Sequence, residues 1–363
     1  MTLPALIVSV YAPSGIRVVA TVTVGNGPLE IGFNPSNSET YVGNLGNDSV
    51  SVISNSNTLL TTIYPLVPNY ITSPRAITFD PVNNDTYVAL STQSSVKAIS
   101  PSTNTVIATV STGGNPRSIL YDPMNHELYV AALGEVTVIN ATTNQFIQNI
   151  DIAGEPKYMA YNPVNNDIYV TNTGPNSCSG CSGADQVSVI SGATNTVVAT
   201  VTVGNQAVWA TFDPTNNDTY VTNAGGSSVS VISSSNSVVA TVTVGPSPYM
   251  VLYDPANHDI FVTNHGGSSV SVINSANTVV ATVSVGTNPT YMVYDSANSD
   301  VYVGNTGPGS KPGSTVSVIS SSNSVVATVR VGKEPEGLAF DSTNNDVYVS
   351  NYADGTVSVI SSS

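Results

Sequence analysis

Three basic side chains stand at the same position of a repeating sequence, where they could act together on an anion. Arg75, Arg117 and Lys157 each follow a Pro at the start of a short apolar segment. The chain holds only 8 Lys and Arg among 363 residues, so three at one repeat position depart from an otherwise uncharged pattern. Clustered cations are typical of a site for a carboxylate or an acidic glycan. The alternative is that these charges only solvate a surface and offset nearby acids.

The same repeat position, and the one after it, add aromatic and acidic side chains. The eight occupants are Leu29, Arg75, Arg117, Lys157, Val208, Tyr249, Thr290 and Glu336. The next position adds Tyr158, Trp209 and Tyr291, and acids nearby are Glu30, Glu155, Glu334 and Glu336. If the repeats form a ring, these residues meet at the mouth of its central channel. We therefore predict a polarised, aromatic-edged ligand site made by Arg75, Arg117, Lys157, Tyr158, Trp209, Tyr249, Tyr291 and Glu336.

The two cysteines form the motif Cys178-Ser-Gly-Cys181 within a Gly/Ser/Asn-rich insertion. A redox Cys-x-x-Cys requires a helix N-terminus in a βαβ setting, and a metal clip requires two further ligands. The sequence offers neither nearby, so we predict a disulfide that stiffens the loop.

The histidines and the recurrent Asp residues are explained by their places in turns between strands. His126 and His258 occupy a turn position that is Asn or Ser in other repeats, and His265 begins a loop. The recurrent Asp-Pro-x-Asn-Asn-Asp segments lack the spacing, the Gly and the distal Glu of an EF-hand loop, so side-chain capping of turns explains them. No nucleophile elbow, P-loop or dinucleotide fingerprint occurs. We expect no catalytic residues, no metal and no cofactor.

The elements that position these residues come from one repeated unit. Its turn is marked by residues spaced 40 to 51 positions apart: Pro35, Pro81, Pro123, Pro163, Pro214, Pro255, Ser296 and Ser342. A period of about 40–45 residues is the blade length of a β-propeller. Each period contains four short segments in which apolar and polar residues alternate, as in β-strands. We predict an all-β fold, an eight-bladed β-propeller of four-stranded antiparallel blades.

The two ends of the chain fit the closure of such a ring. The last repeat ends on a third strand, residues 356–360, and residues 16–24 supply a matching outer strand. The prediction is a single domain over 1–363, with N-terminal closing strands in 1–25 and eight repeats in 26–363. Residues 7–10 resemble one more strand, so either they or residues 356–360 are left over as an open edge that recruits another molecule.

Composition narrows the functional classes. The net charge is −15, charged residues make up 9% and hydrophobic residues 40%, whereas an average soluble domain is roughly 25% charged. An acidic surface repels nucleic acid and anionic membranes. No apolar run approaches the roughly 18 residues of a membrane span, and no signal peptide is recognisable. We expect neither nucleic-acid binding nor membrane insertion.

The motifs carry a family resemblance. Tyr169-Val-Thr-Asn172 and Tyr220-Val-Thr-Asn223, with near matches at 261–264 and 348–351, resemble the signature of YVTN-repeat β-propellers over practically the whole chain. The nearest in appearance are propellers of archaeal surface-layer and other cell-surface proteins. The resemblance implies extracellular display and interaction rather than a defined chemistry.

The leading functional expectation is therefore an extracellular, non-enzymatic scaffold or binding protein that acts in adhesion, surface-layer or filament assembly. Its partners would be other surface proteins, glycans, or copies of itself paired through a strand edge. Sequons at Asn47, Asn84, Asn140 and Asn217 are candidate glycosylation sites and favour an exported protein. The alternative is a propeller enzyme of the metal-dependent lactonase or lyase type, with Glu30 and Glu336 as the plausible ligands in the central channel.

Overall fold

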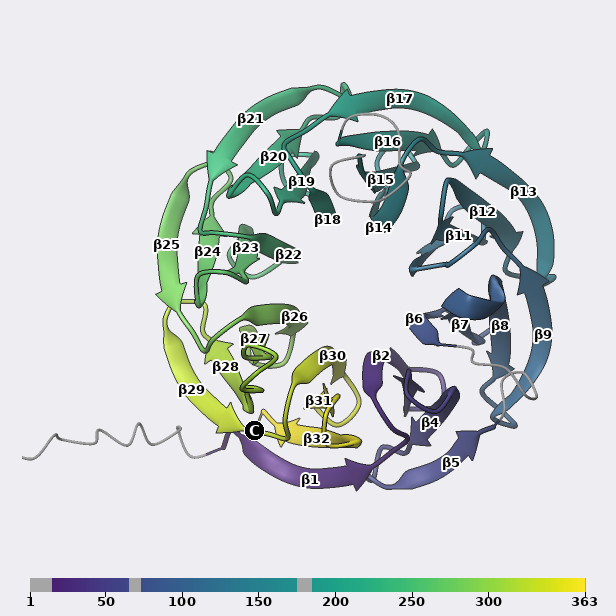
Figure 1. The fold of residues 1–363 in the computed structure, drawn as a ribbon, viewed down its shortest axis with the longest axis vertical. Helices are drawn as coiled ribbons and strands as arrows, with labels where there is room; N and C mark the ends of the chain where they lie inside the picture. Colours follow the sequence, from purple (N-terminus) through teal and green to yellow (C-terminus); the bar gives the residue numbers. More distant parts are fainter. Residues whose placement is uncertain (1–14, 65–72, 175–184, 363) are drawn as a thin grey trace, which may run out of the picture.

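The computed structural model describes residues 15–64, 73–174 and 185–362 as eight four-stranded antiparallel sheets arranged in a ring (Figure 1). The predicted eight-bladed β-propeller is confirmed. Blade 1 contains β2 to β5, and successive blades follow in chain order to blade 8, which contains β30, β31, β32 and β1. A single 3₁₀ turn, η1 (Ser91–Gln93), joins two strands of blade 2.

Each blade runs from the channel to the rim in four strands. The innermost strands surround the channel: β2 (Pro28–Asn34), β6 (Pro74–Phe79), β10 (Ser118–Asp122), β14 (Glu155–Asn162), β18 (Ala207–Asp213), β22 (Pro248–Asp254), β26 (Pro289–Asp295) and β30 (Pro335–Asp341). The second strands are β3 (Glu39–Asn44), β7 (Thr86–Leu90), β11 (Glu127–Ala132), β15 (Asp167–Thr173), β19 (Asp218–Asn223), β23 (Asp259–Asn264), β27 (Asp300–Asn305) and β31 (Asp346–Asn351).

The other two strands of each blade lie farther out. The third strands are β4 (Ser49–Ile53), β8 (Ser95–Ser100), β12 (Glu135–Asn140), β16 (Gln186–Ser191), β20 (Ser228–Ile232), β24 (Ser269–Ile273), β28 (Thr315–Ile319) and β32 (Thr356–Ser361). The outer strands form the rim: β1 (Arg17–Thr23), β5 (Leu59–Ile63), β9 (Thr105–Ser111), β13 (Gln145–Asp151), β17 (Thr196–Thr202), β21 (Val238–Thr243), β25 (Val279–Ser284) and β29 (Val325–Arg330).

Turn chemistry sets the first hairpin of each blade. In blade 5 the buried carboxylate of Asp213 accepts a 2.8 Å hydrogen bond from the backbone N–H of Thr215, and Asn217 adopts φ +61°. A short carboxylate that caps the turn and an Asn that tolerates left-handed backbone are the roles expected from the sequence. The same Asp-to-backbone bond recurs in blades 2, 3, 6, 7 and 8.

The ring closes where the ends of the chain meet. The N-terminal strand β1 pairs antiparallel with β32, from Arg17 opposite Ser361 to Thr23 opposite Thr356, as predicted. Because β32 also pairs with β31, it is not an open edge, which excludes one of the two positions considered for a leftover strand. The other, residues 7–10, lies outside the described residues, as do Cys178 and Cys181.

The core lies between neighbouring blades. The aromatic residue that opens each Tyr-Val-Thr-Asn motif is fully buried. In six blades it is a Tyr whose hydroxyl reaches the turn between the third and outer strands of the next blade; the exceptions are blade 6, which has Phe261, and blade 7, which precedes the split blade 8. Tyr169 donates to Asn236 Oδ1 at 2.9 Å, and Tyr220 donates to Asn277 Oδ1 at 2.8 Å. Neighbouring blades are therefore joined by apolar packing, and six of these contacts add a hydrogen bond to an Asn side chain that the repeat supplies.

No helix in the described residues is long and apolar enough to span a lipid bilayer.

Candidate functional site

The third residue of the motif holds the inner strands of the next blade. Thr222 Oγ1 donates to the carbonyl of Tyr249 at 2.8 Å, and Thr171 Oγ1 donates to the carbonyl of Val208 at 2.7 Å. The hydroxyls of Thr263 and Ser350 make the same bond to Thr290 and Leu29 in the blades that follow them. These four bonds fix the backbone of four residues that line the channel.

The four charged channel positions follow blades that lack this hydroxyl. The equivalent residues are Gly43 before Arg75, Ala89 before Arg117, Ala131 before Lys157 and Gly304 before Glu336. At Gly304 a Cβ atom would lie 3.0 Å from the carbonyl oxygen of Pro335, so the inner strand of blade 8 packs closely against a small residue. A charged residue at the channel therefore occurs wherever the preceding blade has Gly or Ala in place of the motif Thr or Ser.

All eight predicted channel positions gather around one cavity of about 530 Å³. The volume lies within the range of about 300–1,000 Å³ typical of small-molecule sites. Basic side chains come from blades 2 to 4, aromatic rings from blades 4 to 7, and acids from blades 8 and 1. The lining residues are Leu29, Glu30, Arg75, Arg117, Lys157, Tyr158, Val208, Tyr249, His265, Thr290, Tyr291 and Glu336. The structure thus brings together the predicted site residues; their role in binding stays a prediction.

A second cavity, of about 180 Å³, adjoins the first and shares Glu30, Arg117 and Tyr158 with it. Trp209 and several apolar side chains of the inner strands line it. Glu30 and Tyr158 therefore stand between the two cavities.

The basic side of the cavity is only partly neutralised. Glu155 Oε1 lies 2.6 Å from Arg117 Nη2 and 2.9 Å from Lys157 Nζ. Arg75 forms no salt bridge within the described residues, and the Nε atoms of Arg75 and Arg117 are buried without a hydrogen-bond partner there. One carboxylate thus serves two cations, and unused guanidinium donors remain for an anionic ligand.

Burial lowers the pKa of Lys157. Arg117 and Arg75 lower it further, whereas the hydrogen bond and the charge of Glu155 oppose the change. The Lys157 ammonium is half-buried and lines the cavity, where its charge adds to those of Arg75 and Arg117.

The acidic side holds two carboxyl groups that titrate near neutral pH. Burial raises the pKa of Glu30 to about 7, against opposing effects of the Tyr291 hydroxyl and the charge of Arg75. Burial raises the pKa of Glu336 to about 8, and the negative charges of Glu334 and Glu30 act in the same direction. Carboxyl groups of this kind can exchange protons at neutral pH, which ordinary surface carboxylates cannot.

An aromatic cluster surrounds the first of these carboxyl groups. Tyr291 donates to Glu30 Oε1 at 3.2 Å, and its hydroxyl lies 3.3 Å from that of Tyr158. Tyr158 stacks on Trp209 with ring centroids 3.7 Å apart, and Tyr249 contacts Tyr291 edge-on at 5.9 Å. Rings from four blades thus remove water from Glu30, which is the cause of its raised pKa.

Sequence reasoning missed His265 as a channel residue. Its Nδ1 atom is buried without a hydrogen-bond partner among the described residues, and its Nε2 atom lies 3.2 Å from Asn288 Nδ2. The interpretation as a loop residue is right for its backbone, but the side chain turns into the cavity beside Tyr249, at a centroid distance of 6.2 Å. The available signal was its place directly after a motif Asn, at the channel end of a second strand.

The other histidines are turn residues, as predicted. His126 and His258 have φ of +56° and +61°, and each ring nitrogen Nδ1 contacts a Tyr hydroxyl of the same hairpin. Within the described ranges, no three His, Cys, Asp or Glu side chains are grouped so that they could hold a metal ion.

Comparison with known proteins finds likeness in three dimensions only. No family model and no curated protein matches the sequence. The dihydro-heme d1 dehydrogenase NirN in complex with DHE is 14% identical, with a TM-score of 0.73 over 95% of this chain and 76% of that one. Virginiamycin B lyase from Staphylococcus aureus is 12% identical, with a TM-score of 0.63 over 94% and 98%. Hydrazine synthase from Kuenenia stuttgartiensis is 16% identical, with a TM-score of 0.62 over 99% of both chains.

At such low identity these structures establish the propeller fold. They bear against the leading functional expectation nonetheless, since all three are named as enzymes and none as a surface scaffold. The expectation of a non-enzymatic scaffold or binding protein is therefore corrected. In this chain itself, the part of the alternative that places an enzyme site in the central channel is favoured by Glu30 and Glu336, because burial raises the pKa values of these two carboxyl groups into the neutral range. Residue type alone does not reveal that burial.

Proposed function

We propose that this protein is an acid–base enzyme whose active site is the mouth of the central channel. Its substrate carries a carboxylate, and the reaction is an elimination, of the class that lyases catalyse. The observation that carries the proposal is the pair Glu30 and Glu336, with pKa values raised to about 7 and about 8, in one cavity with three basic side chains.

The two carboxyl groups suit opposite tasks. At pH values between about 7 and 8 a large share of Glu30 is ionised and can accept a proton, while a large share of Glu336 is protonated and can donate one. Pairs of titratable groups whose pKa values are separated by their surroundings commonly divide the roles of base and acid in this way.

The basic side chains give the substrate its orientation and stabilise developing charge. Arg75, which has an unused donor, binds the substrate carboxylate. Glu30 removes the proton on the carbon next to that carboxylate, and the charge that develops on the carboxylate oxygens is offset by Arg75 and Lys157. The electron pair of the C–H bond becomes a carbon–carbon double bond, the bond to the leaving oxygen breaks, and Glu336 protonates that oxygen. Atoms and electrons balance without an oxidant or reductant.

The names of the structural neighbours agree with this class without proving it. Virginiamycin B lyase and a streptogramin B lyase are both ring-shaped relatives in fold, the second 10% identical with a TM-score of 0.61. Membership of the YVTN-repeat family, an extracellular location and glycosylation of the sequons stay predictions, and none of them conflicts with an exported lyase.

The test is a screen of carboxylates that carry an oxygen leaving group on the β-carbon, from 3-hydroxy acids to uronate oligosaccharides. The product of elimination is an unsaturated carboxylate, which absorbs in the ultraviolet. Glu30→Gln is expected to lower kcat by about 10²- to 10⁴-fold, the usual contribution of a general base. Arg75→Gln is expected to raise KM by about tenfold, the loss of one charge-assisted contact.

Matched controls carry the same chemical changes outside the channel. Asp151→Asn, on the outer strand β13, and Arg330→Gln, at the exposed end of β29, are expected to leave both constants unchanged. Because side chains supply the base and the acid, EDTA is expected to have no effect. Full activity of Glu30→Gln, or activity lost to EDTA and restored by a divalent cation, would contradict the proposal.

A further inference from the structure

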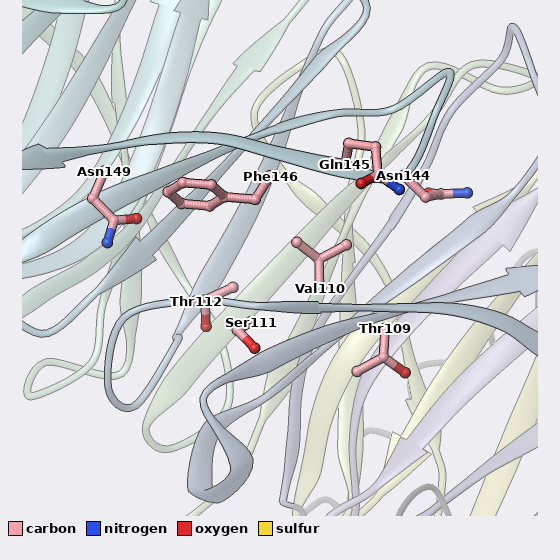
Figure 2. A pocket seen from close by; sticks show the side chains of 8 residues that line it. All are labelled: Thr109, Val110, Ser111, Thr112, Asn144, Gln145, Phe146 and Asn149. Carbon is pink, nitrogen blue, oxygen red and sulfur yellow. The ribbon is translucent and has the colours of Figure 1, made fainter.

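A groove on the rim, far from the channel, is the second place where the chain departs from its repeat. It lies between the outer strands β9 and β13 of blades 2 and 3 (Figure 1) and has a volume of about 450 Å³. In Figure 2 the ring of Phe146 and the amide of Asn149 extend from one strand, and Val110 points toward them from the other. The groove is lined by Thr109, Val110, Ser111, Thr112, Asn144, Gln145, Phe146 and Asn149.

Strand register shows how unusual its aromatic residue is. Phe146 pairs with Ile139 of the third strand. In every other blade the residue paired with the equivalent Ile is a smaller aliphatic one: Val18, Leu59, Val106, Val197, Val238, Val279 and Val325. The Phe146 side chain remains 52% exposed, so its ring does not fill the core.

The amide at the far end of the groove departs in the same way. Asn149 pairs with Thr137, and its seven equivalents are all threonine: Thr21, Thr62, Thr109, Thr200, Thr241, Thr282 and Thr328. Asn149 is exposed, and no hydrogen bond within the described residues occupies its side chain. Two exposed substitutions on one strand, three residues apart, both border the same groove.

The lining has the chemistry that sugars require. None of the eight residues is charged, and beside one exposed ring they carry three amides and three hydroxyls. The Asn144 Oδ1 atom already accepts a hydrogen bond from the Tyr87 hydroxyl, so the amides that face a ligand are those of Gln145 and Asn149. Amides and hydroxyls both donate and accept, which matches the hydroxyl groups of a sugar. The ring face carries a negative quadrupole, which attracts the C–H groups on the apolar face of a pyranose. The nearest cation, Lys97, stands behind the lining, where its Nζ donates to Thr109 Oγ1 at 2.7 Å.

We propose that the groove between β9 and β13 is a binding site for a neutral saccharide. An extended peptide added to a strand edge would depend on backbone groups, which all eight outer strands have, whereas the features unique to this groove are side chains. An acidic glycan would meet a net charge of −15 with no basic residue in the lining. The proposal stands on its own observations and does not depend on the reaction in the channel.

The experiment uses the intact chain and a panel of neutral tetrasaccharides built from glucose, mannose, galactose or xylose, with binding measured by calorimetry and saturation-transfer NMR. The double variant Phe146→Val, Asn149→Thr restores the side chains that other blades carry at these positions, so it is expected to fold. At least one tetrasaccharide is expected to bind the native chain, and the double variant is expected to bind it about tenfold or more weakly, because it loses both the stacked ring and the amide.

A control variant, Val279→Ala on β25, changes the equivalent rim position of another blade and is expected to leave affinity unchanged. The proposal is overturned if no tetrasaccharide binds at millimolar concentration, or if the double variant binds like the native chain. It is also overturned if an array of extended peptides binds the groove and the saccharides do not. Activity in the channel assay is expected to be the same in both variants, which keeps failure of this site distinct from failure of the proposed enzyme.

Discussion

Glu30 illustrates how a single residue acquires chemistry from residues distant in sequence. It lies on β2, yet the Tyr291 hydroxyl that contacts it belongs to β26, 261 positions along the chain. Tyr158 of β14 contacts Tyr291, and Trp209 of β18 stacks on Tyr158. The carboxyl group becomes a candidate base because the ring brings these aromatic residues to the same opening, where they exclude water.

The first prediction is a bell-shaped pH profile for the elimination. The base acts in its ionised form, so the rate rises as the pH increases through about 7, where Glu30 loses its proton. The acid acts in its protonated form, so the rate falls as the pH increases through about 8, where Glu336 loses its proton. The profile of kcat/KM is therefore expected to peak between these two values.

Because the two groups interact, the two limbs report the pair rather than either residue alone. In Glu336→Gln the basic limb is expected to disappear, together with a lower maximal rate. A profile that stays flat from pH 6 to 9 in the native enzyme would be inconsistent with this assignment.

The sequence could predict which residues line the candidate site, but it could not predict their pKa values. Arg75, Arg117, Lys157 and Glu336 were found because they break a repeat at one position, and alignment of repeats places such residues in a common layer. The raised pKa of Glu30 and the inward side chain of His265 depend on which rings converge across the channel. That convergence is set by eight inter-blade packings, and no single repeat contains it.

At the scale of elements, each position of the Tyr-Val-Thr-Asn motif has a distinct structural role. The Tyr hydroxyl binds the next blade near the rim, and the Thr hydroxyl binds the next blade near the channel. The Asn side chain stays within its own blade, where Asn223 donates to Ser228 and Ser230 of the third strand. The Val side chain is buried in the core in every blade. The four residues thus join a second strand to its own hairpin, to the core and to both ends of its neighbour.

Blade 6 breaks this scheme at Phe261, which leads to the second prediction. Its expected partner, Asn323 of blade 7, has a buried Oδ1 without a hydrogen-bond partner in the described structure. Phe261→Tyr adds a hydroxyl at the place where Tyr220 and Tyr169 bond to their Asn partners. The free energy of unfolding is expected to increase by about 1 kcal/mol, the usual net contribution of one hydrogen bond.

Urea unfolding followed by circular dichroism measures the change. Tyr220→Phe serves as the reverse variant, because it removes the same bond between blades 5 and 6, and it is expected to be destabilising. If Phe261→Tyr proves less stable than the native chain, the fully buried site has no room for the hydroxyl and the explanation fails.

The fold itself could be predicted in detail because the sequence pattern of each strand recurs in eight repeats. Turn residues, alternation and the split blade 8 all recur or complement one another, so an error in one repeat is corrected by the others. The inner strands β6 and β10 begin differently from those of the other blades. No other repeat shares these differences, so comparison of the repeats could not predict them. They became visible only with the pairing of strands.

Across the described residues, burial raises the pKa of carboxyl groups in most of the blades. Glu30, Asp300 and Glu336 reach about 7, 6 and 8, and burial is the leading cause each time. The other carboxyl groups whose pKa burial raises are Asp85, Glu135, Asp167, Asp218, Asp254, Asp259, Asp295 and Asp346. The folded chain therefore holds protons that the unfolded chain has already released.

The third prediction is that the protein is more stable in mild acid than at alkaline pH. A raised pKa in the folded state stabilises fully below the unfolded value, and this contribution is lost as the pH increases through the folded value. The loss is expected over the window from about pH 4 to about pH 8, and relief of the −15 net charge at low pH acts in the same direction. The melting temperature is thus expected to be several degrees higher at about pH 5 than at about pH 8.5.

Differential scanning calorimetry in a series of buffers of equal ionic strength tests this. The double variant Glu30→Gln, Glu336→Gln removes the two carboxyl groups whose pKa values burial raises to about 7 and about 8, and it is expected to flatten the dependence of the melting temperature on pH above about pH 6. A melting temperature that increases from pH 5 to pH 8.5 would show that the buried carboxyls do not govern stability.

The pairing of β1 with β32 also sets how the ring responds to mechanical load. Arg17 faces Ser361 and Thr23 faces Thr356, so tension applied at Arg17 and Ser361 acts on the same end of the pair. Hydrogen bonds loaded in this way break one after another, at far lower force than a strand pair pulled lengthwise. Tension would therefore peel blade 8 open before any other. Glu336 and Glu30 lie on the inner strands of blades 8 and 1, which the hydrogen bonds from Ser350 to Leu29 and from Tyr348 to Asn57 also hold together. The two carboxyl groups would therefore stay side by side while β1 peels away, and they would separate only when these contacts between the blades break as well.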